Sequence, residues 1–117
     1  MNAPLFSQDD AKKYDIPGGI CYLYPDSPTG RLSCAYVIQD GIYPEEGRKW
    51  NAVCTEAMFI IDGEFTMTLG DETFKLKKND VVYVPPKTPY SMEGKGTSFV
   101  FIEPKWDSAQ NTQYEEQ

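Results

Sequence analysis

Residues 56–77, EAMFIIDGEFTMTLGDETFKLK, alternate apolar with polar side chains and contain two short turn signals. Asp62-Gly63 and Gly70-Asp71 each predict a two-residue hairpin between the strands that flank them. Both hairpins would place the same apolar residues on one face of the sheet, namely Met58, Ile60, Phe65, Met67, Leu69, Phe74 and Leu76. Because two separate turns agree on one face, the stretch predicts three antiparallel strands with a common buried side.

Turn signals also recur along the rest of the chain, about every 8 to 12 residues. They include Asp40-Gly41 and the Gly-Lys-Gly sequence at residues 94–96. Strand-like runs rich in β-branched and aromatic residues lie between the turns, at residues 20–24, 31–38, 51–61, 64–69, 72–77, 81–84 and 98–103. No window shows a convincing helical period, so the sequence predicts an all-β sandwich or barrel.

The composition is that of a single globular domain of 117 residues, 40% of them apolar and 25% charged. The formal net charge of -7 argues against a nucleic acid or a membrane surface as partner, because both bind Lys/Arg-rich surfaces. Three cysteines, Cys21, Cys34 and Cys54, leave one unpaired in any disulfide scheme, which predicts reduced thiols and a cytoplasmic location. The chain has no histidine and so lacks the commonest metal ligand and general base.

Glu56 does not fit the apolar face on which the alternation places it. Period two carries the inward track back from Met58 through Glu56 to Cys54 and then to Trp50. A carboxylate on such a face either reaches water at the rim or lies in a cavity, where it could transfer protons. Cys54 on the same track is either a small buried apolar residue or a reactive thiol.

A proline-rich loop follows the strand-like run at residues 81–84, within the sequence KNDVVYVPPKTPY at residues 78–90. Pro85 and Pro86 cannot donate hydrogen bonds to a neighbouring strand and must end this one. The loop is therefore stiff, and it is expected to present Tyr90 to the rest of the site.

These two stretches resemble the two motifs of the cupin family. Residues 56–64 are similar to the end of the first motif, E-x6-G, and residues 79–90 are similar to the second, G-x5-P-x-G-x2-H-x3-N. The resemblance implies a cupin, a jelly-roll-like double-stranded β-barrel, over residues 20–104. An N-terminal arm would then occupy residues 1–19 and a C-terminal tail residues 105–117. Pro104-Lys105-Trp106 is similar to a segment of the histidine-poor cupins of ethanolamine-utilisation proteins.

The resemblance also implies where the metal ligands of other cupins would fall. The last histidine ligand corresponds to Tyr90, and the internal glycines of the second motif correspond to Asn79 and Lys87. The two histidines before the glutamate fall at Trp50 and Ala52 or at Lys49 and Asn51. Only Glu56 remains of the four ligands, and one carboxylate does not hold a divalent transition metal. We therefore expect no metal ligands and no cofactor.

Three functions agree with these residues. The first is a metal-independent isomerase, epimerase or lyase for a small polar metabolite, with Glu56 as acid/base and Tyr90 as hydrogen-bond donor. The second is a non-catalytic module that binds a small molecule in the same cavity, and the third is a metal cupin with the unusual ligands Cys54, Glu56 and Tyr90. The candidate substrate-binding residues are Trp50, Cys54, Met58 and Tyr36.

The other side of the strand at residues 51–61 is also apolar, at Val53, Ala57, Phe59 and Ile61. The second sheet or a partner must cover such a face. We therefore expect a homodimer.

Overall fold

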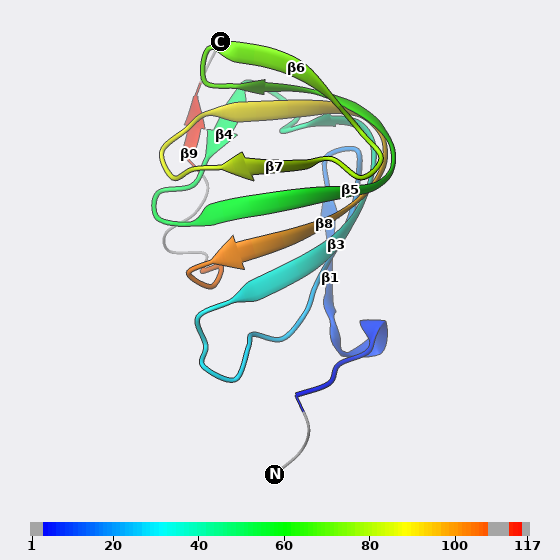
Figure 1. Cartoon of the computed structure of the whole chain (residues 1–117), viewed down its shortest axis with the longest axis vertical. Coiled ribbons are helices and arrows are strands. Elements are labelled where there is room, and N and C mark those ends of the chain that lie inside the picture. Colours follow the sequence, from blue (N-terminus) through cyan, green and yellow to red (C-terminus); the bar gives the residue numbers. More distant parts are fainter. Residues whose placement is uncertain (1–3, 108–112, 116–117) are drawn as a thin grey trace.

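The computed structural model describes residues 4–107 and the backbone of residues 113–115 (Figure 1). The elements are a 3-10 turn η1 (Gln8–Asp10) and the strands β1 (Lys12–Ile16), β2 (Gly19–Leu23), β3 (Ser33–Tyr43), β4 (Arg48–Trp50), β5 (Thr55–Leu69), β6 (Glu72–Lys77), β7 (Val81–Val84), β8 (Tyr90–Glu103) and β9 (Gln113–Glu115). No helix in the described part of the chain is long and apolar enough to span a membrane. The expected tail at residues 105–117 falls mostly outside the described residues.

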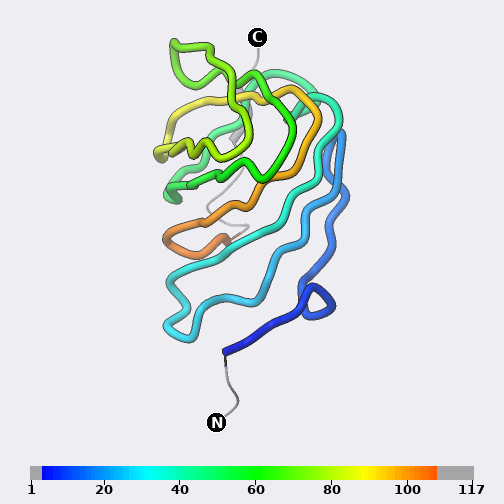
Figure 2. The backbone as a smooth tube through the Cα atoms, turned by 45° about the vertical axis from the view of Figure 1, so that its right-hand side comes forward, coloured from blue at the N-terminus to red at the C-terminus, as the bar shows by residue number. Residues whose placement is uncertain are grey.

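The described strands are antiparallel and belong to one hydrogen-bonded sheet, so the all-β prediction is confirmed. Strand β8 lies at its centre, with β3 on one side and β5 on the other. Strands β2 and β1 extend the sheet beyond β3, while β6 and β7 pair with the two halves of β5. Strand β4 joins β8 at Tyr90 and pairs with β9 on its other side. The sheet curls back on itself, as Figure 2 shows.

The sheet folds over along a line of glycines that we call the glycine crease, consisting of Gly41, Gly63, Gly94 and Gly96. Gly41 of β3 pairs with Gly94 of β8, and Gly63 of β5 pairs with Gly96 of β8. A Cβ atom at Gly63 would lie only 2.1 Å from the carbonyl oxygen of Lys95. An added Cβ at Gly94 or Gly96 would lie as close to a backbone oxygen, at 2.2 and 2.3 Å, so these three positions need glycine, whereas Gly41 has room for a Cβ but a φ of 137°.

The sequence predicted turns at three places where the structure has continuous strands, so these three predictions are wrong. Asp40-Gly41, Asp62-Gly63 and residues 94–96 lie inside β3, β5 and β8, at the glycine crease. Glycine suits a tight turn and a sharp bend equally well, so the local sequence does not distinguish the two.

The predicted hairpin at Gly70-Asp71 is confirmed, because β5 and β6 pair with the expected register. The hairpin at Asp62-Gly63 is replaced by a β-bulge in β5, with Ile61 as the extra residue between Ile60 and Asp62. A bulge moves the inward face from even to odd positions, as a two-residue turn would. For this reason the predicted apolar face is retained: five of its residues, Met58, Ile60, Phe65, Met67 and Leu76, are buried in the core.

The sheet begins earlier in the chain than the expected boundary at residue 20. Strand β1 lies in the segment assigned to an N-terminal arm, yet it pairs with β2 from Lys12↔Leu23 to Ile16↔Gly19. The segment therefore contributes a strand to the fold and, as described below, side chains to the cavity.

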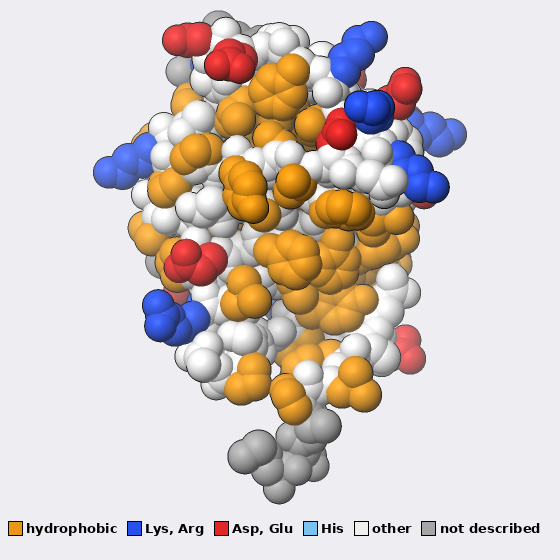
Figure 3. Space-filling model, viewed as in Figure 1, with side chains coloured by type: hydrophobic (Ala, Val, Ile, Leu, Met, Phe, Trp, Pro, Cys, Tyr) orange, Lys and Arg blue, Asp and Glu red, His pale blue; other side chains and the backbone are white. Residues whose placement is uncertain are grey.

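The outer side of the sheet carries two rows of mostly aromatic residues, which we call the outer aromatic face. The rows cross β2, β3, β8, β5 and β7 and consist of Tyr22, Tyr36, Phe99, Phe59 and Val81, and of Cys34, Phe101, Ala57 and Tyr83. Figure 3 shows hydrophobic side chains gathered on this side of the molecule. Four residues of this face are exposed, namely Phe59, Val81, Tyr83 and Phe101. The other half of the folded sheet therefore does not cover this face.

Candidate functional site

A cavity of about 280 Å³ lies inside the folded sheet. Its lining combines apolar side chains with polar ones, namely Tyr14, Asp15, Gln39, Tyr43, Lys49, Glu56, Tyr90 and Ser98. A small, mainly apolar cavity with a few convergent polar groups is typical of a site for a small molecule.

Glu56 points into this cavity from the first half of β5. Its neighbours Met58 and Ile60 alternate inward on the same strand, and the strand is held between β7 and β8. Glu56 is only 8% exposed, so the interpretation that it reaches water at the rim is wrong. The side-chain amide of Asn51 donates a hydrogen bond to Glu56 Oε2, which gives the buried carboxylate the donor that burial requires.

Asn51 is itself held in the loop between β4 and β5. It is 1% exposed, and its backbone carbonyl accepts a hydrogen bond from the Lys87 amide at 2.7 Å. Its side-chain Oδ1 accepts no hydrogen bond from any residue that the structure describes. Asn51 therefore fixes the Glu56 carboxylate through its amide nitrogen and keeps an acceptor beside it.

A buried cation belongs to the same cavity. Lys49 of β4 is 8% exposed, and its Nζ donates a hydrogen bond of 2.8 Å to the Tyr43 hydroxyl at the end of β3. The same Nζ lies 5.2 Å from the centroid of the Tyr43 ring, within reach of a cation–π interaction. A buried ammonium group needs such partners, because it has lost its hydration.

The proline-rich loop carries Tyr90 into the cavity, where the side chain is buried and its ring lies 6.4 Å from that of Tyr43. Asn79 and Lys87, at the positions where the resembled motif has glycine, both have positive φ, 75° and 59°. These angles favour glycine, so the backbone of the motif is kept although the residues differ. The Pro89 carbonyl accepts a hydrogen bond from the Gly70 amide at 2.9 Å, which ties the loop to the β5–β6 turn.

Of the other candidate substrate-binding residues, only Met58 is part of the cavity lining. Cys54 is fully buried, and its thiol donates a hydrogen bond to the Pro104 carbonyl at 3.1 Å. Tyr36 lies on the outer side of the sheet, with its ring 6.4 Å from that of Tyr22. Trp50 alternates with the inward-pointing Lys49 on β4 and is absent from the lining.

Alternation along the chain did not identify Lys49 or Asn51 because β5 begins only at Thr55. Residues 51–54 form a loop, and period two does not continue through a loop. Of the two placements that the cupin resemblance implied for the histidines, the buried pair in the structure is Lys49 and Asn51. Tyr43, Tyr14 and Trp106 also line the cavity, and they come from strand ends and from segments outside the motifs.

Cys21 of β2 lines the cavity. The two buried charges of the cavity, Lys49 and Glu56, both affect the pKa of its thiol. Burial raises the pKa of the Cys21 thiol; Lys49 opposes this shift and Glu56 adds to it. The thiol is therefore protonated at neutral pH, and Lys49 and Glu56 both lie within electrostatic reach of one atom in the cavity.

These residues do not fit a divalent metal. Among the residues that the structure describes, no group of three or more His, Cys, Asp and Glu side chains is arranged to hold a metal ion. The four ligand positions of the motif hold Lys49, Asn51, Glu56 and Tyr90, and an ammonium group repels a cation. Cys54 belongs to the alternative ligand set, but its thiol donates a hydrogen bond to the backbone carbonyl of Pro104 and does not line the cavity.

Comparisons with known proteins agree with this architecture. Residues 42–103 match the sequence model of the cupin domain. The structure of Streptomyces Pac13 with uridine has a TM-score of 0.86 at 13% identity, over 100% of this chain and 95% of that one. KdgF from Halomonas sp. has a TM-score of 0.74 at 17% identity, over 92% of this chain and 99% of that one. At these identities the likeness shows the fold alone.

A curated relative matches a shorter segment. It is the uncharacterised protein MJ1618 of Methanocaldococcus jannaschii, 46% identical over 41 residues. The match covers 35% of this chain and 33% of that protein, so it spans about a third of the relative's length.

Proposed function

The chain belongs to the cupin family, and on that basis we propose that it is a metal-independent isomerase or lyase that moves protons on a small polar metabolite inside its barrel. One observation carries the proposal: a buried carboxylate, Glu56, and a buried ammonium, Lys49, share a cavity of about 280 Å³. Each is oriented by a hydrogen bond, to Asn51 and to Tyr43 respectively. Buried acid and base groups that are held in place in a small cavity are the usual equipment for general acid–base catalysis.

In the proposed reaction, Glu56 takes a proton from a carbon next to a carbonyl group of the substrate. The ammonium of Lys49 and the hydroxyls of Tyr43 and Tyr90 stabilise the negative charge that develops on the carbonyl oxygen. In an isomerase, Glu56 then returns the proton to carbon. In a lyase, a hydroxyl group on the adjacent carbon takes a proton from the Lys49–Tyr43 pair and leaves as water, while the two carbons form a double bond.

Lys49 supports a reaction of this kind because it provides a fixed positive charge inside the protein. In a small apolar cavity, such a charge interacts with a developing oxyanion more strongly than it would in water. The likeness to Pac13, described as a nucleoside dehydratase and solved with uridine, supports a lyase for a small hydroxylated compound.

Replacement of Glu56 by Gln tests the proposal, because Gln keeps the shape and hydrogen bonding of the side chain but cannot take a proton. The protein is incubated in D₂O with aldoses, ketoses, uronates and nucleosides whose sugar carries an aldehyde or ketone group, and NMR follows deuterium uptake at carbon and loss of water. We expect the wild-type protein to act on one of these classes. Glu56→Gln should still bind that compound but lose turnover by at least about a hundredfold. Glu64→Gln, an exposed glutamate on the same strand, is the matched control and should retain activity.

The alternative of a non-catalytic binding module is kept because the cavity alone supports it. It predicts that the wild-type protein binds a compound of the panel without deuterium uptake, and that Glu56→Gln changes only affinity. Elemental analysis separates the metal-dependent alternative, since stoichiometric Fe, Mn, Ni or Zn lost together with activity in chelator would replace the proposal.

A further inference from the structure

One side of the cavity is made by two aromatic residues from opposite ends of the chain. Tyr14 of β1 and Trp106, three residues after the end of β8, both line the cavity and are half-buried. Their ring centroids are 6.5 Å apart with the planes tilted by 54°. We call this pair the aromatic wall. Both residues lie outside residues 42–103, the part that matches the cupin domain, whereas Tyr43, Lys49 and Glu56 lie inside it.

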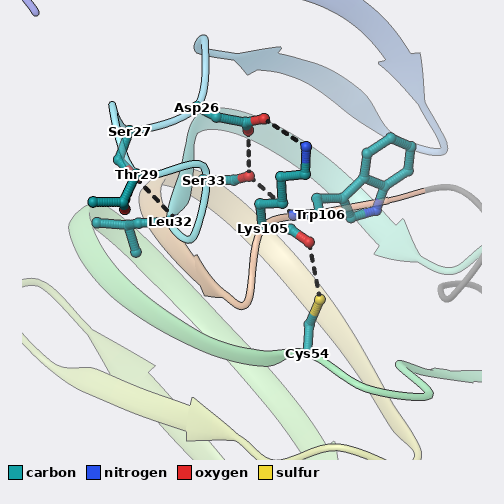
Figure 4. A network of polar contacts seen from close by, with 8 residues as sticks. All are labelled: Asp26, Ser27, Thr29, Leu32, Ser33, Cys54, Lys105 and Trp106. Carbon is teal, nitrogen blue, oxygen red and sulfur yellow. Dashed lines mark hydrogen bonds and ion pairs between the residues drawn. The ribbon is translucent and has the colours of Figure 1, made fainter.

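Trp106 is held in place although it belongs to no strand. Its backbone amide donates a hydrogen bond of 2.9 Å to the Ser33 hydroxyl, which donates in turn to Asp26 Oδ1 at 2.8 Å. The neighbouring Lys105 Nζ lies 3.5 Å from Asp26 Oδ2. On the other side of the segment, the Cys54 thiol donates to the Lys105 carbonyl at 3.7 Å (Figure 4) and to the Pro104 carbonyl at 3.1 Å.

This network has a consequence for the cavity. Ser33 is 1% exposed, so its hydroxyl has lost its hydrogen bonds to water. The hydrogen bonds to Asp26 and to the Trp106 amide replace them. The bonds fix the backbone at the point where the indole ring enters the lining. The Tyr14 ring lies against Trp106 on one side, and the Nζ of the exposed Lys12 lies 5.3 Å from its ring centroid. The aromatic wall is therefore a preorganised surface, which binds a flat ring at a low cost in entropy.

The cavity is thus aromatic at one side and carries charged and hydroxyl groups elsewhere in its lining. We propose that the aromatic wall is a subsite for a flat unsaturated ring, stacked on Trp106. The substrate class is then a flat ring joined to a small hydroxylated part that also carries a carbonyl group, as in a nucleoside with an oxidised sugar, with the hydroxylated part at Glu56 and Lys49. This inference rests on the proposed function for the assignment of the reacting end. Ser33 and Asp26 are positioning residues that act through Trp106.

Calorimetric titration with uridine and with D-ribose tests the subsite, because D-ribose has the hydroxyl groups but no flat ring. The wild-type protein should bind uridine more tightly than D-ribose. Trp106→Ala should weaken uridine binding roughly fivefold to a hundredfold, the range for lost base–aromatic stacking, and leave D-ribose within about twofold. Trp106→Phe keeps a flat ring and should retain most of the affinity for uridine.

Ser33→Ala tests the positioning role. It should weaken uridine binding without affecting D-ribose, since only the placement of Trp106 changes. The matched control is Ser27→Ala, because Ser27 lies in the loop just before Ser33 but bonds to Thr29 and to the Leu32 amide. Thermal melts verify folding, and if Trp106→Ala does not fold, Trp106→Phe and Ser33→Ala decide the question.

Three results would overturn the inference. The first is equal affinity of the wild-type protein for uridine and D-ribose, and the second is that the Trp106 and Ser33 variants lose affinity for both compounds equally. The third is no uridine binding at all. None of these results decides the proposed function. Proton transfer on a ringless aldose or uronate, abolished by Glu56→Gln, would still establish that function while the aromatic subsite is rejected.

Discussion

The side-chain amide of Asn51 donates a hydrogen bond to the carboxylate of Glu56, and both side chains are buried. The donor is neutral, so it stabilises the carboxylate without the strong pairing that an arginine would impose. The carboxylate is therefore held in one orientation by an uncharged donor. The loop at residues 51–54 makes this possible, because it turns Asn51 back toward the strand that carries Glu56.

Asn51→Ala should lower the free energy of unfolding by about 1.5–3 kcal/mol at neutral pH, because it leaves a buried carboxylate without its donor. Urea denaturation measures the change. In the Glu56→Gln background the same substitution should cost roughly 1 kcal/mol less, since the acceptor is then neutral. Strictly additive effects of the two substitutions would contradict the proposed coupling.

The Cys21 thiol should report the two buried charges through the pH dependence of its alkylation. Burial raises the pKa of this thiol above its ordinary value of 9.0, Lys49 lowers it and Glu56 raises it. The iodoacetamide reaction at Cys21, followed by mass spectrometry, should therefore have its midpoint above pH 9.0. Lys49→Met should move the midpoint to higher pH, and Glu56→Gln should move it to lower pH.

Cys34 provides an internal control for this experiment. The pKa of its thiol is raised by burial alone, so its midpoint should not move in either variant. Equal shifts at Cys21 and Cys34 would mean that the substitutions changed the fold and not the local charge.

Gly63→Ala should destabilise the protein by roughly 3 kcal/mol or more, because the added Cβ would lie 2.1 Å from the Lys95 carbonyl oxygen at φ 84°. Gly30→Ala is the control. Gly30 also has positive φ, 72°, but no atom lies within 4 Å of its added Cβ, so only the backbone cost of about 1 kcal/mol applies. Chemical denaturation measures the free energy of unfolding of both variants. A similar decrease in the two would show that the close backbone contact at the glycine crease does not add to the destabilisation.

We expect the chain to form a homodimer through the outer aromatic face. The two rows of this face contain no charged side chain, although the chain carries a net charge of -7, and a second copy offers the same uncharged surface. Light scattering should give twice the 13.3 kDa of one chain. Phe101→Lys should shift the protein to a monomer, whereas Leu5→Lys, an exposed position outside this face, should not. A monomeric wild-type protein would refute the expectation.

Alternation and the motif resemblance predicted the class of fold and its buried face, but not the path of β5. The inward face changes from even to odd positions between Ile60 and Phe65, and this change is visible in the sequence. A two-residue turn and a β-bulge both produce it. Only the pairing of β8 with both halves of β5 distinguishes the two, and that pairing joins residues far apart in the chain.

The candidate site divides in the same way. The sequence by itself determined that Glu56 points inward and that a stiff loop presents Tyr90, since both follow from local backbone preferences. Only the tertiary structure decided that Lys49 joins them and that Trp106 forms a wall of the cavity. The physical reason is that a loop interrupts the alternation before β5, and that contacts between distant segments depend on how the sheet folds over at its glycines. Periodicity reports which side of a strand is buried; it does not report which strands close around the same space.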